Sequence, residues 1–151
     1  MGFLDTINIS ASGLTAQRLR MDTIANNMAN VDTTRTEKGG PYRRQVVVLE
    51  ARSTKNSKTS FRSILDSKSS NLGSGVRVKE IRELDENEAP FRKVYDPSHP
   101  DADANGYVNY PNVNIVEEMV NMISATRSYE ANAKVIEATK SMAMRALDIG
   151  K

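Results

Sequence analysis

The C-terminal stretch Ile115–Asp148 reads IVEEMVNMISATRSYEANAKVIEATKSMAMRALD, and its spacing decides the fold that we expect. Heptad positions recur every three or four residues along the whole stretch, which predicts one long helix. Asn114 is the expected N-cap, because Glu117 follows at the spacing of a capping box. At about 1.5 Å per residue this helix is roughly 50 Å long, more than the diameter of a small domain. The heptad positions are Ile115, Met119, Met122, Thr126, Tyr129, Ala133, Ile136, Lys140, Ala143 and Leu147.

The N-terminal stretch from Phe3 to Asn30 has the same period and predicts a second helix. Outside its apolar stripe the side chains are mostly neutral and polar, and such groups are less costly to bury than charges. The helix is therefore suited to being surrounded by other protein, and we expect the two helices to form a coaxial, coiled-coil-like pair. Its apolar stripe consists of Leu4, Ile7, Ala11, Leu14, Met21, Ala25 and Met28, with Arg18 as a polar interruption.

The middle of the chain, residues 32–111, predicts short strands and loops. We expect one strand within Tyr42–Ala51, a second at Val76–Ile81 after a glycine-rich turn, and a third at Phe91–Tyr95. Residues 53–70 are rich in Ser and Lys, and we expect a flexible loop there. The predicted fold is mainly α with a small β-rich middle (α+β). Residues 1–31 and 112–151 would together form an inner helical domain, and residues 32–111 the β-rich middle region.

Composition narrows the function classes. The chain has no cysteine, which excludes disulfides and thiolate metal sites. Its net charge of +2 gives no sign of a nucleic-acid partner. No run approaches the roughly 20 apolar residues of a membrane span. The first residues lack the basic and apolar regions of a cleavable secretory signal, so the sequence alone indicates the cytoplasm unless an uncleaved signal directs export.

No group of residues predicts catalysis, a cofactor or a metal. Asp101, Asp103, Asn105 and Gly106 match the opening of a calcium-binding EF-hand loop, but Asn112 stands where that loop needs a bidentate Glu. We interpret the stretch as a turn in which Gly106 adopts a positive φ. The single histidine, His99, is insufficient for a catalytic triad. We expect Glu117 and Glu118 to complement the helix dipole at the start of the C-terminal helix.

Two interpretations of the helices remain open from the pattern alone. In the first, the apolar stripes associate with copies of the chain or with related subunits. In the second, the helices form a hairpin in a monomeric binding module with an unknown partner. The middle, about 80 residues long, is too small and irregular to cover two such helices, which favours self-association.

Two terminal motifs and a central block resemble a known family. The stretches 11–17 (ASGLTAQ) and 25–33 (ANNMANVDT) resemble the N-terminal signature of flagellar rod and hook proteins. The stretches 112–120 (NVNIVEEMV) and 127–132 (RSYEAN) resemble the start and continuation of their C-terminal helix. The block 96–108 (DPSHPDADANGYV) and Tyr42-Arg43-Arg44 narrow the resemblance to proximal rod subunits of the bacterial flagellar basal body. The motif residues that we carry over are Asn26, Asn27, Asn30, Tyr129, Glu130 and Asn132.

The resemblance implies a structural subunit rather than an enzyme. Such subunits are exported unfolded by the flagellar type III apparatus, without cleavage, and polymerise through their terminal helices into the axial rod across the periplasm. The implied partners are copies of the chain, other rod proteins, the adaptor that joins the rod to the MS ring, and the export apparatus. Nucleic acid and direct membrane insertion are not implied. The implied assembly interface comprises the N-terminal stripe given above and, on the C-terminal helix, Ile115, Met119, Met122, Tyr129, Ala133, Ile136, Ala143 and Leu147.

Overall fold

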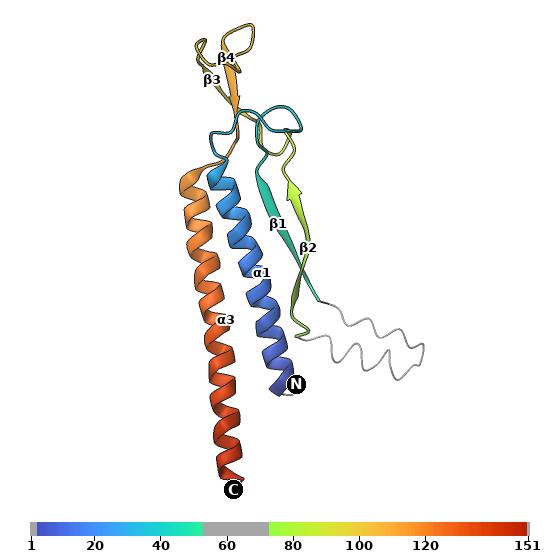
Figure 1. Ribbon diagram of the computed structural model, residues 1–151. Helices are drawn as coiled ribbons and strands as arrows, with labels where there is room; N and C mark the ends of the chain where they lie inside the picture. Colours follow the sequence, from blue (N-terminus) through green and yellow to red (C-terminus); the bar gives the residue numbers. More distant parts are fainter. Residues whose placement is uncertain (1–2, 53–72, 151) are drawn as a thin grey trace, which may run out of the picture. The chain divides into compact units, whose positions relative to one another are not determined.

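The computed structural model describes residues 3–52 and 73–150. The chain forms α1 (Phe3–Ala29), β1 (Gln45–Ala51), β2 (Val76–Glu83), β3 (Arg92–Tyr95), β4 (Tyr107–Tyr110) and α3 (Ile115–Ile149), as Figure 1 shows. Two long terminal helices with a small β middle confirm the predicted fold class. The Ser- and Lys-rich stretch 53–70 lies outside the described residues.

Polar side chains satisfy backbone groups at the start of α3 and at the end of α1. Asn114 caps α3, because its Oδ1 accepts from the backbone N–H groups of Val116 at 3.0 Å and Glu117 at 3.4 Å. At the end of α1, Asn30 Nδ2 donates to the backbone carbonyl of Asn26 at 2.9 Å. This bond occupies a carbonyl near the end of the helix. The helix bounds agree with the predicted stretches to within one residue.

The strands form two separate two-stranded sheets, β1–β2 and β3–β4. Main-chain bonds from Arg52 N to Gly75 O and from Leu84 N to Arg44 O show that β1 and β2 run antiparallel. In the second sheet Arg92 pairs with Tyr110 and Tyr95 with Tyr107. The three predicted strands are confirmed, but β4 was not predicted. Gly106 precedes β4 with φ of 79°, which confirms the predicted turn.

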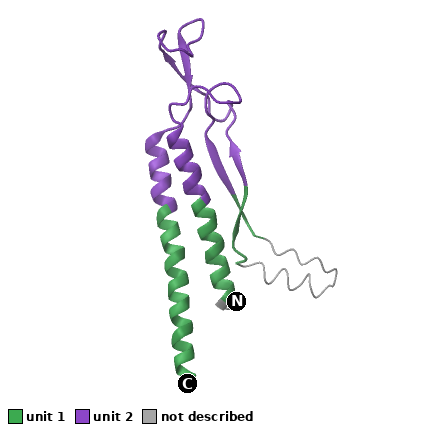
Figure 2. Cartoon of the chain, viewed as in Figure 1, with its two compact units in different colours: residues 1–18, 49–79, 126–151 green, residues 19–48, 80–125 purple. Residues whose placement is uncertain are grey.

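The chain divides into two compact units, coloured separately in Figure 2. Unit 1 comprises residues 1–18, 49–79 and 126–151, and unit 2 comprises residues 19–48 and 80–125. In unit 1 the helices approach closely at Gly13, where an added Cβ would lie 3.0 Å from Asn132 Nδ2. Glycine at this position therefore allows α1 and α3 to pack against each other.

The described core is small and contains many polar groups. Its buried apolar residues are Ala16, Ile24, Tyr42, Val108 and Ala125. Its buried polar residues are Ser10, Thr23, Asn27, Glu118 and Thr139. Thr23 and Thr139 satisfy their hydroxyls by donating to the carbonyl four residues earlier, at 2.9 and 2.6 Å. Within the described helices, the faces that are buried are thus built mainly from small or polar side chains.

Candidate assembly site

Many of the large apolar side chains of α3 lie on its exposed surface. In its first turns Val116 is 69% exposed and Val120 is 61% exposed, and Ile115, Met119 and Ile123 are also exposed. Farther along α3 the exposed apolar residues are Tyr129, Val135, Met142, Met144, Leu147 and Ile149. A soluble monomer rarely leaves this much aliphatic surface uncovered, and such surfaces commonly mark protein interfaces.

The predicted interface residues fall into two groups by exposure. Those that lie at the surface are Leu4, Ala11, Ala25, Ile115, Met119, Tyr129, Ala133 and Leu147. Those that are half-buried are Ile7, Leu14, Met21, Met28, Met122, Ile136 and Ala143. None of them is fully buried. The fully buried positions of both helices belong to other residues.

The family-motif residues also separate. Asn27 is buried, Asn30 and Asn132 are half-buried, and Asn26, Tyr129 and Glu130 are exposed. Asn132 donates from Nδ2 to the backbone carbonyl of Ser128 at 2.9 Å. Only Asn27 thus lies fully inside the folded chain, and it belongs to a polar cluster in unit 2.

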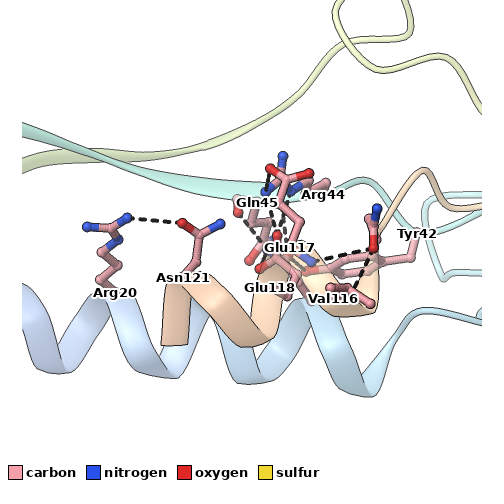
Figure 3. Close-up of polar contacts among 10 residues, drawn as sticks. Arg20, Tyr42, Arg44, Gln45, Val116, Glu117, Glu118 and Asn121 are labelled. Carbon is pink, nitrogen blue, oxygen red and sulfur yellow. Dashed lines mark hydrogen bonds and ion pairs between the residues drawn. The ribbon is translucent and has the colours of Figure 1, made fainter. Parts of the chain in front are cut away.

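We call this group of residues the Glu118 cluster: Asn27 at the end of α1, Tyr42, Arg44 and Gln45 at the start of β1, and Glu117 and Glu118 in the first turn of α3. Glu118 is 1% exposed. Its Oε1 accepts from Arg44 Nε at 2.8 Å and from Nη2 at 2.5 Å, and Nη2 also donates to Glu117 Oε1 at 3.0 Å (Figure 3). One guanidinium therefore contacts both carboxylates.

Asn27 uses its full hydrogen-bonding capacity in the cluster. Its Nδ2 donates to Gln45 O at 2.9 Å and to Glu118 Oε2 at 3.2 Å. Its Oδ1 accepts from the Tyr42 hydroxyl and from Gln45 N, both at 2.9 Å. With both backbone groups of Gln45 paired, the Asn27 side chain acts like a neighbouring strand. It connects the end of α1 to the start of β1 and, through Glu118, to α3.

The cluster shifts two ionisation equilibria. Burial, with smaller contributions from Glu83 and Glu118, raises the pKa of Tyr42 to about 12. Burial alone would lower the pKa of Arg44, but the hydrogen bonds and charges of Glu118 and Glu117 outweigh it, so the pKa is raised. At neutral pH Tyr42 is therefore a neutral donor and Arg44 is a cation.

The sequence interpretation of Glu117 and Glu118 was incomplete. We expected the helix dipole to account for both. Instead both carboxylates accept hydrogen bonds from Arg44, because a long guanidinium with several donors can bridge adjacent positions. Arg44 lies more than 70 residues away in sequence, and no local pattern identifies such a partner. The sequence did single out Arg44 in one way, through its place in the motif Tyr42-Arg43-Arg44 that carries the family resemblance, but that motif does not name Glu118 as its partner.

The described residues form neither a candidate metal cluster nor a candidate membrane-spanning helix. Within residues 3–52 and 73–150, no three His, Asp or Glu side chains gather to hold a metal ion. The stretch that opens like an EF-hand lies between strands β3 and β4 rather than between two helices. No helix in this part of the chain is both long enough and apolar enough to cross a membrane.

Comparison with known proteins first gives the class. Residues 7–35 match the family model described as flagella basal body rod protein, and residues 104–149 match that of the C-terminal region of flagellar basal body rod FlgEFG proteins. These segments contain most of α1 and all of α3, with the Glu118 carboxylate. The chain thus carries both terminal regions of a flagellar basal-body rod protein.

Full-length relatives give the particular family. The chain is 50% identical to the flagellar basal-body rod protein FlgC of Bacillus subtilis, over 97% of each chain. It is also 50% identical to that of Borreliella burgdorferi, over 99% of this chain and 98% of the relative, and 38% identical to that of Escherichia coli O6:H1 over the whole of both. The chain therefore belongs to the FlgC family of flagellar basal-body rod proteins.

Family membership confirms the resemblance to flagellar rod proteins. The chain is a structural protein of the flagellar basal-body rod, not an enzyme, and the isolated binding module is set aside. Association through the apolar stripes, and the interface residues themselves, stay predictions.

Proposed function

We propose that this chain polymerises into the proximal part of the rod through the exposed apolar surfaces of its terminal helices. The observation that carries the proposal is the set of exposed aliphatic side chains along α3. In the first half of that helix these are Ile115, Val116, Met119, Val120 and Ile123. Covering them would remove apolar surface from water at about 25 cal/mol per Å². The folded chain itself does not obtain that stabilisation.

The proposal assigns roles to three segments. Residues 1–31 and 112–151 form the inner helical domain of the assembled rod, and residues 32–111 form its outer part. Neighbouring subunits bury the stripe that begins at Leu4 on α1 and the stripe that begins at Ile115 on α3. Small exposed residues on α1, such as Ala11 and Ala25, allow a neighbouring helix to approach closely.

The proposed partners are copies of the chain, other rod proteins and the adaptor between the rod and the MS ring. The chain reaches the periplasm through the flagellar type III export apparatus, without a cleaved signal peptide. Two features suit such a route. The described core is small, so little packing opposes unfolding before export, and the chain has no disulfide to reduce.

A pair of exposed-surface variants tests the assembly role. Val116→Asp with Val120→Asp places two carboxylates where the monomer has exposed side chains, so the far-UV circular dichroism of the purified chain should not change. Swimming should be lost when this variant replaces the native copy in the cell, because burying two unpaired carboxylates in a subunit interface is strongly unfavourable.

The matched control is Ala131→Asp, which adds a carboxylate at another exposed position of α3, outside the stripe of large apolar residues. It should retain swimming and complete flagella. Normal motility of the Val116/Val120 variant would contradict the proposed interface. Secretion of both variants into the culture medium, followed by immunoblotting, distinguishes a defect in export from a defect in assembly.

A further inference from the structure

The helix faces that are buried in this chain provide little steric definition of register. On α1 the buried residues are Ser10, Ala16, Thr23, Ile24 and Asn27, and on α3 they are Glu118, Ala125 and Thr139. Among these described side chains Ile24 is the one large aliphatic group. Helix pairs normally fix their register through large side chains that insert between those of the partner. Small side chains at the fully buried positions oppose the sliding of one helix along another less than large side chains would.

The Glu118 cluster is the feature of unit 2 that a sliding helix would disrupt. Glu118 is buried and accepts from both Arg44 and Asn27, which come from different elements. Moving α3 by one turn displaces the carboxylate by about 5.4 Å, beyond hydrogen-bonding distance of both donors. A buried carboxylate without partners is severely unfavourable. One axial position of α3 therefore satisfies the cluster, and neighbouring positions do not.

A second polar contact in unit 2 agrees with the same alignment. Arg20 Nη2 donates to Asn121 Oδ1 at 3.5 Å, one helical turn beyond Glu118 on α3 (Figure 3). This contact is long and Arg20 is half-buried, so it discriminates weakly between positions. The strong discrimination lies with the buried carboxylate.

We infer that Asn27, Arg44 and Glu118 are positioning residues that fix the register of α3 against α1 and β1. Arg44 and Glu118 contribute specificity of alignment more than stability, because replacing both members of a buried ion pair by apolar groups of similar size is often neutral in stability. The inference rests on the proposed function in one respect: the register determines where the exposed side chains of α3 are presented to the next subunit.

Distance measurement between two spin labels tests the register directly. The chain has no cysteine, so nitroxide labels attach only at introduced positions. Asp22→Cys on α1 and Val116→Cys on α3 are both exposed and both lie in unit 2, outside the Glu118 cluster. Pulsed electron paramagnetic resonance of the full-length monomer should give one narrow distance distribution.

Removing the ion pair should loosen the register without unfolding the helices. In Arg44→Met/Glu118→Met we expect unchanged helical circular dichroism and a distribution that is broadened or displaced by about one helical turn, roughly 5 Å along the axis. The matched control is Lys38→Met/Glu83→Met, which removes an exposed ion pair of 3.1 Å in the same unit. The control should reproduce the narrow distribution of the parent chain.

An unchanged narrow distribution of label distances in a folded Arg44→Met/Glu118→Met variant would overturn the inference. A milder variant serves if the double substitution unfolds. Arg44→Lys keeps the charge but loses the guanidinium fork, and it should broaden the distribution in a folded chain. An Arg44→Lys distribution identical to the parent would also refute a positioning role.

The distance measurement uses the monomer and needs no assembly. The Val116/Val120 carboxylate variant, in contrast, should assemble poorly although its register cluster is intact. A failure of the proposed interface and a failure of the register inference are therefore separately visible.

Discussion

The Asn27 side chain offers the sharpest test of the energetics of unit 2. It is 1% exposed and makes four hydrogen bonds, to Tyr42, to both backbone groups of Gln45 and to Glu118. Asn27→Ala removes all four and leaves buried partners unsatisfied. At about 1 kcal/mol for each neutral bond and somewhat more for the bond to the carboxylate, the loss is about 3–5 kcal/mol. That is a large part of the 5–15 kcal/mol typical of a folded domain.

The neighbouring residue provides a control. Asn26 is exposed, and its Nδ2 donates to the Tyr42 hydroxyl and to Gln45 Oε1 at 3.3 Å each. Water can replace both bonds, so Asn26→Ala should cost less than about 1 kcal/mol. The two substitutions remove the same atoms one helix position apart, and they differ in burial and in bonding.

Urea denaturation of the full-length chain, followed by circular dichroism at 222 nm, measures the difference. Asn27→Ala should lower the midpoint far more than Asn26→Ala. Asn27→Asp keeps the acceptor oxygen but places a second carboxylate beside Glu118, so it should destabilise more at pH 7 than at pH 4. If the Ala variants at 26 and 27 unfold within about 0.5 kcal/mol of each other, the cluster does not carry the stability argued above.

Three further outcomes are expected. Gly75→Ala should destabilise unit 1 by about 1–3 kcal/mol in the same urea assay, because Gly75 has φ of 94° and an added Cβ would collide with Ser12 Oγ. The control is Gly39→Ala, which should cost less, because Gly39 has φ of 83° but open space around it. The folded pKa of Tyr42, about 12, exceeds its ordinary value of 10.0, so ionisation favours the unfolded chain and stability should fall between pH 10 and 12, with a smaller slope in Tyr42→Phe. Asn114→Ala should cost about 1 kcal/mol through loss of the α3 cap, whereas Asn112→Ala should be near neutral.

The helices were predictable because their signals are local. A heptad period over more than 30 residues, an Asn cap and a following capping-box Glu specify α3 without tertiary information. The strand β4 was missed because Tyr107–Tyr110 has four residues and directly follows a loop of Asp, Asn and Gly that dominates the pattern. Its pairing with β3 is what makes it a strand. The partnership of Arg44 with Glu118 was invisible for a similar reason, since it depends on segments 74 residues apart.

The distribution of side chains over the two helices connects the sequence to its role. A monomeric helical hairpin would bury its large aliphatic residues and expose its polar ones. Here the fully buried positions of the described helices are, apart from Ile24, Ala, Ser, Thr, Asn and Glu, whereas many Ile, Val, Met and Leu side chains of α3 are exposed. Small and polar contacts supply geometry but little hydrophobic free energy, whereas exposed aliphatic groups supply free energy once a neighbour covers them. Under the proposed function, such a chain aligns its helices by hydrogen bonds and gains most of its stability once neighbouring subunits cover its exposed aliphatic side chains. Low stability before assembly would also keep the subunit easy to unfold for export.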